Sequence, residues 1–308
     1  MKISRSLSGL CLPPHSACVA LGLFDGVHLG HRAVLDTMLA CAGSSGLAPL
    51  VFTFSIGKHI PDAKHGMTRL MSEDMTFALL EGMGVSHVAA PDFGEFRGLS
   101  PAAFVKDVLA GGLGAARVVC GYDYRFGKNA SGGADALSRL CGELGVSVEV
   151  IPAVAADGAP ISSSRVRALI QEGDIHAANN LLGRRFAVDF EVIAGRKLGR
   201  TLDWPTINQP FPVDFTVPRY GVYATLTHTH GKIHSSITNV GVKPTVGSDT
   251  VLAETYIRGF DGDLYGGRVK VEFLRFLRPE RKFSSLEELR AQIACDAQEA
   301  SLVVVPFC

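Results

Sequence analysis

Two histidines three residues apart are the side chains in this sequence best suited to handle phosphate. His28 and His31 bracket Gly30 in the stretch Gly22–His31, which runs Gly-Leu-Phe-Asp-Gly-Val-His-Leu-Gly-His. Imidazole N–H groups donate hydrogen bonds to phosphate oxygens, and a glycine lets a phosphate approach the backbone. A tight turn with two exposed histidines is the alternative interpretation. The position between a strand pattern and a helix pattern favours a nucleotide-binding loop.

The elements on either side of this loop are predicted from hydrophobic patterning. Ala17–Leu23 is a nearly continuous apolar run, as in a strand buried on both faces. Downstream, four apolar residues recur at helical spacing: Val34, Leu35, Met38 and Leu39. A helix that begins here directs free backbone N–H groups and the positive end of its dipole toward the loop, where they attract an anion.

Two other polar segments follow apolar runs in the first half of the chain. Gly121–Gly127 comes directly after Ala115–Cys120, and Ile161–Arg167 contains three consecutive serines. The serine hydroxyls and Arg165 could hold phosphate oxygens. Capping of a helix is the better explanation for a serine run taken by itself.

Helix and strand patterns alternate through the first half of the sequence. Strands are expected at Leu50–Phe54, Val85–Ala89, Ala115–Cys120 and Val146–Val150, and helices over about Ser72–Glu81, from Ser100 to Gly112, over Ala134–Leu144, from Ile161 and over Asp174–Gly183. The alternation predicts an α/β domain with an open, Rossmann-like parallel sheet and helices on both faces. Ligands of such sheets bind beyond the carboxyl ends of the strands, where the histidine loop and Gly121–Gly127 fall.

The pattern changes after Gly183. A double arginine follows, and strands then come in series at Phe186–Ile193, Gly221–Thr227, Ile233–Val240, Ala253–Ile257 and Arg268–Leu274. Such a series predicts a small antiparallel β-barrel, which leaves few exposed edges. A terminal helix is expected from the capping pattern Ser284-Ser285-Leu286-Glu287, with Leu286, Leu289 and Ile293 on one face. The expected domains are residues 1–183 and 184–308.

Composition narrows the class of protein. The 308 residues are 47% hydrophobic and 19% charged, and they carry no net charge, so no global field draws the protein to nucleic acid or to an acidic membrane. Seven cysteines without a Cys-x-x-Cys pair fit reduced thiols, and no run reaches membrane-spanning length. A cytoplasmic protein without nucleic-acid or membrane partners is expected; its oligomeric state is left open.

The ordered set of motifs resembles the prokaryotic bifunctional riboflavin kinase/FAD synthetase (FMN adenylyltransferase) family over nearly the whole chain. The motifs that carry the resemblance are Gly22–His31, Gly121–Gly127 and Ile161–Arg167 in the first domain, and Pro205–Asn208, Gly221–Tyr223, Asn239–Val246, Glu254 and Asp261–Gly266 in the second. The resemblance implies that the second domain phosphorylates riboflavin with ATP to give FMN. It implies that the first transfers the adenylyl group of a second ATP to FMN, giving FAD and pyrophosphate. Both reactions need Mg²⁺.

The resemblance also implies roles for particular residues of the first domain. His28 and His31 would clasp the ATP triphosphate as catalytic residues, within a nucleotide-binding loop that includes Gly22, Phe24, Asp25 and Gly30. Ser163, Ser164 and Arg165 would hold the departing pyrophosphate, and Asp123 and Arg125 would lie near the flavin. The FMN phosphate is itself the nucleophile, so positioning and charge neutralisation suffice for this transfer.

In the second domain the attacking hydroxyl must lose a proton, which calls for a general base. Glu254 is the expected base, and Thr206 and Asn208 are the expected ligands of Mg²⁺ and of the ATP phosphates, because hydroxyl and amide oxygens are hard ligands. Without the resemblance, a polar turn and a solvated strand carboxylate would be the preferred interpretations of these segments.

The sequence departs from the family pattern at four places. Ser55–His59 replaces a Pro-His-Pro element, Ala130 stands where an arginine is usual, Ser164 replaces a threonine, and Asp203-Trp204 replaces Gly-Phe. Two alternatives therefore stay open. One is a flavin-binding carrier or regulator that has lost catalysis, and the other is a different His-x-Gly-His nucleotidyltransferase, which leaves the second domain unexplained.

Overall fold

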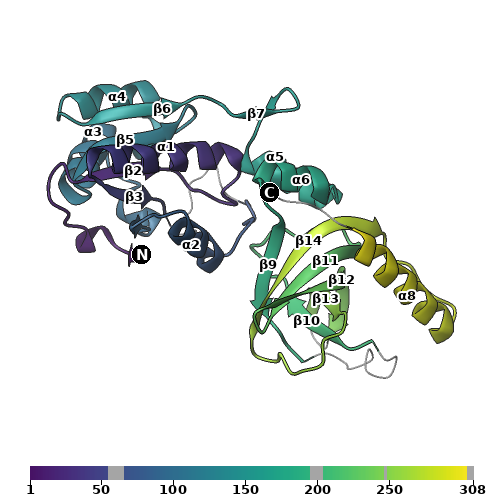
Figure 1. Ribbon diagram of the computed structural model, residues 1–308. Helices are drawn as coiled ribbons and strands as arrows, with labels where there is room; N and C mark the ends of the chain where they lie inside the picture. Colours follow the sequence, from purple (N-terminus) through teal and green to yellow (C-terminus); the bar gives the residue numbers. More distant parts are fainter. Residues whose placement is uncertain (55–65, 195–203, 246–247, 304–308) are drawn as a thin grey trace. The chain divides into compact units, whose positions relative to one another are not determined.

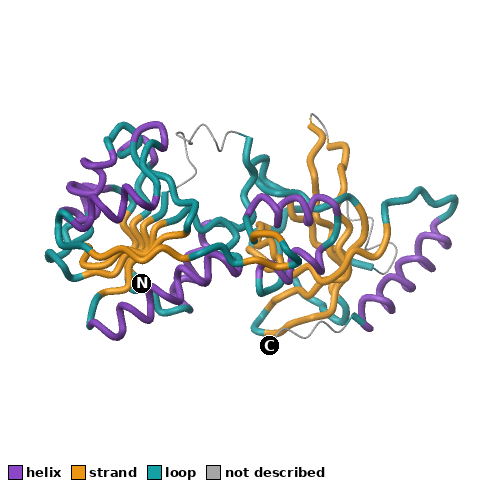
Figure 2. The backbone as a smooth tube through the Cα atoms, turned by 90° about the horizontal axis from the view of Figure 1, so that it is seen from above, coloured by secondary structure: helices purple, strands orange, loops and turns teal. Residues whose placement is uncertain are grey.

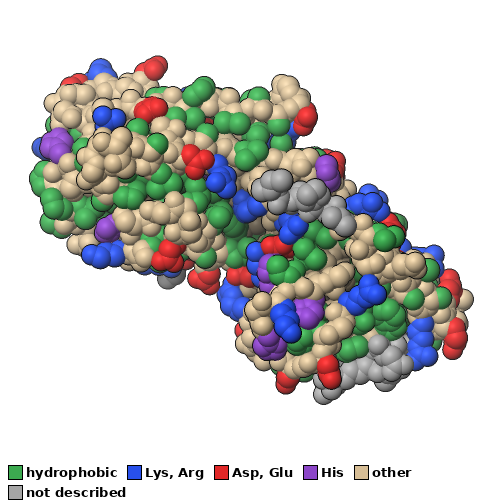
Figure 3. Space-filling model, viewed as in Figure 1, with side chains coloured by type: hydrophobic (Ala, Val, Ile, Leu, Met, Phe, Trp, Pro, Cys, Tyr) green, Lys and Arg blue, Asp and Glu red, His purple; other side chains and the backbone are tan. Residues whose placement is uncertain are grey.

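The computed structural model describes residues 1–54, 66–194, 204–245 and 248–303. The chain divides into two compact units, Met1–Met67 with Glu73–Ser162, and Thr68–Ser72 with Ser163–Cys308. In the described residues no helix is long and apolar enough to cross a membrane. Charges of both signs are interspersed on the face drawn in Figure 3, in keeping with the zero net charge.

The first unit is built on a six-stranded parallel sheet, which confirms the predicted α/β fold. Its strand order is β1 (Lys2–Ser4), β4 (His87–Ala89), β3 (Ala48–Phe52), β2 (Ala17–Leu21), β5 (Ala115–Gly121) and β6 (Ser147–Ile151). β2 lies in the middle and all five of its residues are buried, as its unbroken apolar run predicts. The strand β1 and the small hairpin of β7 (Ala155–Ala156) and β8 (Ala159–Pro160) were not expected from the pattern.

Helices cover both faces of this sheet, as Figure 2 shows. They are α1 (Leu29–Ser45), α2 (Glu73–Gly82), α3 (Pro101–Ala103) continued by the π-helical turns η4 (Phe104–Gly112), and α4 (Ala134–Gly142), with short 3₁₀ turns at η1 (Leu7–Gly9), η3 (Phe93–Glu95) and η5 (Lys128–Ala130). Of the apolar residues predicted at helical spacing in α1, Val34, Leu35 and Met38 are buried, so this side of the helix faces the core. Gly46 ends α1 in the left-handed conformation, with φ of 64°.

The second unit contains the predicted antiparallel barrel (Figure 1). Its strand order is β10 (Thr206–Pro210), β13 (Ser248–Ile257), β12 (Lys232–Thr245), β11 (Gly221–Thr229), β14 (Arg268–Arg278) and β9 (Phe186–Glu191). A bridge from Ile193, just after β9, to Asn208 of β10 brings the two edge strands together. The helices of this unit are α5 (Ser163–Glu172), α6 (Ile175–Leu182) and α8 (Leu286–Leu302).

Hydroxyl side chains line part of the barrel interior. Thr225 contacts Ser236 at 2.8 Å and Thr238 at 2.9 Å, and Thr238 contacts Thr255 at 2.9 Å between hydroxyl oxygens. All four residues are buried, so the mutual hydrogen bonds replace the water that these hydroxyls lose. These residues of β11, β12 and β13 therefore face the barrel interior. The residues between them along each strand point to the outer face of the sheet.

The terminal helix differs in detail from the prediction. Ser285, not Ser284, caps α8, because its hydroxyl accepts the Glu288 backbone N–H at 3.2 Å, and Glu288 reaches back to the Ser284 backbone N–H at 3.0 Å. The capping box is thus shifted by one residue. Leu286, expected on the same apolar face as Ile293, is 61% exposed, whereas Ile293 packs with Ala297 and Ala300 against the barrel.

The division into compact units falls earlier than the predicted boundary at Gly183. Helices α5 and α6 group with the barrel, and Asn179 of α6 donates to the Phe273 carbonyl at 3.0 Å and accepts the Phe186 backbone N–H at 2.6 Å. The segment Thr68–Ser72 also belongs to this unit, where Arg69 forms an ion pair with Asp214 at 2.7 Å. Helix and strand periodicity in the sequence does not predict tertiary contacts of this kind.

Candidate active sites

The predicted nucleotide loop lies where the parallel sheet reverses its order of strands. From β2 the chain runs through α1 to β3 on one side, and β5 pairs with β2 on the other side. Loops that leave the carboxyl ends of two such strands diverge and leave room for a ligand. The stretches Gly22–His31 after β2 and Tyr122–Gly127 after β5 are these two loops.

The loop after β2 is tightly folded on itself. Phe24 is 1% exposed and has a positive φ of 54°, and Val27, fully buried, has φ of 34°, a conformation that is strained for a β-branched residue. A Cβ on Gly22 would lie 2.9 Å from the Phe24 ring, so glycine is required there. Asp25 is also buried. Strain held by burial is a recurring property of ligand-binding turns.

His28 caps the helix that follows. Its Nδ1 accepts the backbone N–H of His31 at 3.2 Å, so in this arrangement Nδ1 carries no proton. The neutral ring then holds its proton on Nε2, which is the nitrogen able to donate to a phosphate. The His31 ring stacks on that of His28 with centroids 3.7 Å apart and meets the Phe24 ring edge-on at 5.3 Å. The two predicted histidines are thus brought together.

Gly30 lies under the His28 ring. A Cβ at this position would lie 3.2 Å from Cε1 and Nδ1 of His28 and 3.5 Å from the carbonyl oxygen of Ile161. The helix start is therefore next to the segment that leads into α5, two residues before Ser163. Glycine at position 30 was predicted because it lets a phosphate approach the backbone. The packing of the His28 imidazole is a second reason for a glycine there.

Asp123 and Arg125 are exposed on the loop after β5, and glycines make room for both. The Asp123 carboxylate lies 3.1 Å from where a Cβ of Gly121 would stand, and the Arg125 guanidinium lies 3.3 Å from that of Gly133. Phe126 anchors the loop in the core, and its ring covers Gly132. The loop thus offers one carboxylate and one guanidinium at the switch point of the sheet.

Ser163, Ser164 and Arg165 open helix α5, which belongs to the second unit. Ser164 is exposed, and Ser163 and Arg165 are half-buried. Arg167, in the same motif, is buried and donates through Nε to the Thr68 carbonyl at 2.6 Å. Of the two arginines in the motif, Arg167 therefore has a structural partner within its unit.

The barrel brings three of the polar side chains of the second domain to one row. Glu254 of β13 lies directly opposite Asn208 of β10 on one side and Asn239 of β12 on the other. Residues in register share a face of the sheet, with Cβ atoms about 5 Å apart. Thr206, two residues before Asn208, points to the same face. Asp261 and Asp263 of the motif Asp261–Gly266 lie on the exposed turn after β13.

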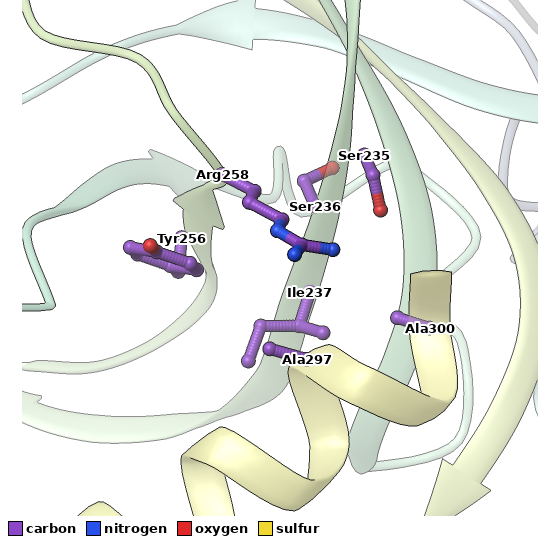
Figure 4. A pocket seen from close by; sticks show the side chains of 7 residues that line it. All are labelled: Ser235, Ser236, Ile237, Tyr256, Arg258, Ala297 and Ala300. Atoms are coloured by element: carbon purple, nitrogen blue, oxygen red, sulfur yellow. The ribbon is translucent and has the colours of Figure 1, made fainter. Parts of the chain in front are cut away.

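A hollow lies on the same sheet face, beside Glu254. Tyr256 and Ile237, each two residues from a member of the row, line it together with Arg258 and the α8 residues Ala297 and Ala300 (Figure 4). It is a shallow surface hollow that leaves no room for a water-sized sphere, so it is not a small-molecule site, which usually encloses roughly 300–1,000 Å³. The Trp204 ring packs on Tyr256 with centroids 4.5 Å apart.

Three buried cysteines have thiols that are unsuited to chemistry. Burial raises the pKa of Cys18 and Cys141 to about 12 and that of Cys120 to about 11, so these thiols stay protonated and unreactive. Within the described part of the chain no three His, Cys, Asp or Glu side chains gather as a metal cluster. Thr206 and Asn208 would bind a metal through a hydroxyl and an amide oxygen, and clusters of His, Cys, Asp and Glu do not include such ligands.

Comparisons with known proteins bear directly on these two sites. The family model for FAD synthetase matches residues 13–165, and the model for riboflavin kinase matches residues 182–304. Bifunctional riboflavin kinase/FMN adenylyltransferases are similar along nearly the whole chain. That of Pseudomonas fluorescens is 35% identical over 99% of both chains, and that of Escherichia coli K12 is 32% identical over 96% of both. The chain belongs to the bifunctional riboflavin kinase/FMN adenylyltransferase family. The predicted resemblance is confirmed.

A solved structure has a similar fold. A protein of Streptococcus pneumoniae reported as a macrolide-efflux protein matches with a TM-score of 0.85 at 26% identity, over 97% of this chain and 98% of that one.

Sequence reasoning missed one member of the row in this family's second module. Asn239 stood in a quoted motif, Asn239–Val246, but no role was assigned to it. The signal that could have found it is the register, because Asn239 aligns with Glu254 only once strands β12 and β13 are paired. Two of the departures, Ser55–His59 and Asp203, lie outside the described residues.

Proposed function

We propose that this protein makes FAD from riboflavin in two ATP-dependent steps, one in each module. The observation that carries the proposal is that the two family models match one chain side by side without overlap. The switch-point loop with His28 and the carboxylate row with Glu254 supply one separate site for each reaction. The enzyme is thus a nucleotidyltransferase and a kinase acting on FMN, riboflavin and ATP, and we expect it to work in the cytoplasm.

In the first module the FMN phosphate attacks the α-phosphorus of ATP, and pyrophosphate leaves. His28 donates from Nε2 to a triphosphate oxygen, and the His31 ring stacked on it helps to fix its orientation. The backbone N–H groups and the positive end of the helix dipole at the start of α1 add to the attraction for phosphate. Ser163, Ser164 and Arg165 hold the departing pyrophosphate, while Asp123 and Arg125 lie toward the flavin.

In the second module the terminal hydroxyl of the riboflavin side chain attacks the γ-phosphorus of ATP. Glu254 accepts the hydroxyl proton as the O–P bond forms, and ADP leaves. Its position between Asn208 and Asn239 at the middle of the barrel sheet fixes it on three hydrogen-bonded strands. A base held in this way needs no rearrangement during the reaction.

Mg²⁺ fits the residues present in the second module. Asn208 is 7% exposed and lies in register with Glu254, so its amide oxygen is a hard ligand on the same sheet face as the carboxylate. Thr206 adds a hydroxyl on the same face. When bound, the ion would neutralise charge on the ATP phosphates.

A single incubation tests the proposal. The protein is mixed with riboflavin, ATP and Mg²⁺, and the flavins are separated by chromatography. FMN and FAD are expected. Riboflavin that binds but stays unchanged would indicate a carrier or regulator instead, and a protein that binds no flavin would indicate an unrelated nucleotidyltransferase.

A further inference from the structure

Asn239 is held in one orientation by a carboxylate outside the proposed catalytic row. Its side-chain Nδ2 donates to Oε1 of Glu280 at 3.0 Å. A carboxylate only accepts hydrogen bonds, so the NH₂ end of the amide must face Glu280 and the carbonyl oxygen must face away. The two ends of an amide look alike in shape, but here the chemistry of the partner distinguishes them.

The carbonyl oxygen of Asn239 is buried and has no hydrogen-bond partner among the residues that the structure describes. A buried acceptor without a partner costs free energy, about 1–3 kcal/mol as a rule, unless a ligand satisfies it. Asn239 lies in register with Glu254, so a donor that reaches this oxygen lies close to the proposed base.

The surroundings of Glu280 are arranged to keep it in place. A Cβ on Gly241 would lie 2.6 Å from the Glu280 carboxyl carbon, so the glycine lets the carboxylate lie close to β12, and a larger residue would push it away. Two residues before Glu280, Arg278 forms a bidentate ion pair with the buried Asp296 of α8, at 2.7 Å from Nη2 and 3.0 Å from Nε. The end of β14 is therefore tied to the helix, and Glu280 follows that fixed point.

From this geometry we infer that Asn239 is a specificity residue of the kinase site, whose carbonyl oxygen accepts a hydrogen bond from a secondary hydroxyl of the flavin's polyol chain. Glu280 is its positioning residue. The inference rests on the proposed function, since it takes the terminal hydroxyl of that chain to lie at Glu254. The polyol carries O–H donors next to the reacting one, and a bound secondary hydroxyl would fix the terminal hydroxyl against the base.

A metal ion is the other ligand that would satisfy this oxygen, and the geometry favours it less. The predicted Mg²⁺ ligands Thr206 and Asn208 both lie on β10, whereas Asn239 lies on β12, with β13 between them. The backbones of strands two apart are separated by roughly 9–10 Å. Oxygens that share one Mg²⁺ lie within about 4 Å of each other.

The test compares two substrates and four proteins. The substrates are riboflavin and a flavin whose side chain keeps the terminal hydroxyl but lacks the secondary hydroxyls. The proteins are the wild type, Asn239→Ala, Glu280→Ala and Glu280→Gln, each with its thermal unfolding midpoint. The wild type should prefer riboflavin by about tenfold in kcat/KM, and Asn239→Ala should abolish the preference by losing activity on riboflavin alone.

The Glu280 variants examine the positioning role. Glu280→Ala lets the amide rotate and should lose most of the preference for riboflavin, while Glu280→Gln keeps an accepting oxygen and should retain it. Equal losses on both substrates in Asn239→Ala, or no loss at all, would overturn the inference, as would restoration of its activity by raised Mg²⁺. If the wild type phosphorylates neither flavin, the proposed function itself fails.

Discussion

The imidazole of His28 accepts the His31 backbone N–H at the start of α1 through Nδ1, and Nε2 is the nitrogen that we propose donates to phosphate. A substitution that removes the ring therefore has two consequences, one for stability and one for chemistry. His28→Ala removes the N-cap, which costs about 0.5–2 kcal/mol, together with the N–H donor. An activity loss in that variant alone would not separate the two effects.

We predict that His28→Asn separates them. Asparagine is a good N-cap residue, so the unfolding free energy should stay close to that of the wild type. Conversion of FMN to FAD should fall by about a hundred- to thousandfold, because the donor aimed at phosphate is lost. Thermal unfolding and a flavin assay on supplied FMN measure the two quantities. Near-normal FAD formation in a stable His28→Asn protein would contradict the role given to this ring.

At the scale of elements, helix α1 offers a matched pair of glycines. Gly30 packs against the His28 ring, whereas a Cβ on Gly43 would meet no atom within 4 Å. Alanine at either position raises helix propensity by about 1 kcal/mol. We predict that Gly30→Ala displaces the His28 ring and lowers adenylyl transfer roughly tenfold or more. Gly43→Ala should leave activity unchanged and raise the unfolding temperature; equal activities in the two variants would contradict the account.

Strand β14 carries a charge cluster whose effect on stability depends on pH. Burial alone would raise the pKa of the Glu272 carboxyl, but Lys270 at 2.7 Å, His228 at 3.2 Å and Arg185 at 3.1 Å together hold it below its usual value. A lowered folded-state pKa stabilises the protein above the unfolded pKa of about 4.3, and this stabilisation disappears as pH falls through the folded value.

We therefore predict that Glu272→Gln lowers the unfolding free energy by roughly 1–3 kcal/mol at pH 7. The difference from the wild type should shrink as pH falls below about 4.5. Glu299→Gln, which breaks an exposed ion pair with Arg275, is the control and should cost less than about 1 kcal/mol. Denaturant unfolding across the pH range gives both numbers. A Glu272→Gln deficit that is independent of pH would mean that packing, not charge, is lost.

Elements with a strong hydrophobic periodicity could be predicted from the sequence. Elements that form only because a neighbouring strand pairs with them could not. The buried strand β2 and the helix α1 follow from their own residues. Strand β10 does not, because Pro-Thr-Ile-Asn has no apolar alternation and pairs only because β13 lies beside it. The position of Asn239 beside Glu254 was missed for the same reason, because it depends on the pairing of β12 with β13. Leu286 was misplaced because α8 begins one residue later than the capping pattern suggested.

At the scale of the molecule, the two modules were predictable from the change of pattern after Gly183, and the packing of the helices that precede it was not. Helix α6 has its own periodicity, which says nothing about which core it joins. Its Asn179 is 1% exposed and bonded to both Phe186 and Phe273 of the barrel. A buried amide with these two hydrogen bonds is a tertiary feature.

We predict that residues 163–308 form a more stable fragment than residues 184–308. Both lack Thr68–Ser72, so the comparison isolates α5 and α6. Removing α6 uncovers Phe186 and Phe273 and leaves the Phe273 carbonyl without the amide that bonds it. The melting temperature of the shorter fragment should be lower by about 5 °C or more. Equal melting temperatures would support a folding boundary at Gly183.

The central claim is that one chain holds two separate active sites that act in sequence. The most direct measurement is the flavin profile of two single variants incubated with riboflavin, ATP and Mg²⁺. Glu254→Gln keeps the size of the side chain but cannot accept the proton, so riboflavin should stay largely unconverted, with turnover lower by about a hundred- to ten-thousandfold, while supplied FMN still becomes FAD. His28→Asn should convert riboflavin to FMN at the normal rate and accumulate it. Loss of both reactions in either stable variant, or FAD formation from riboflavin at wild-type rates in both, would contradict the account.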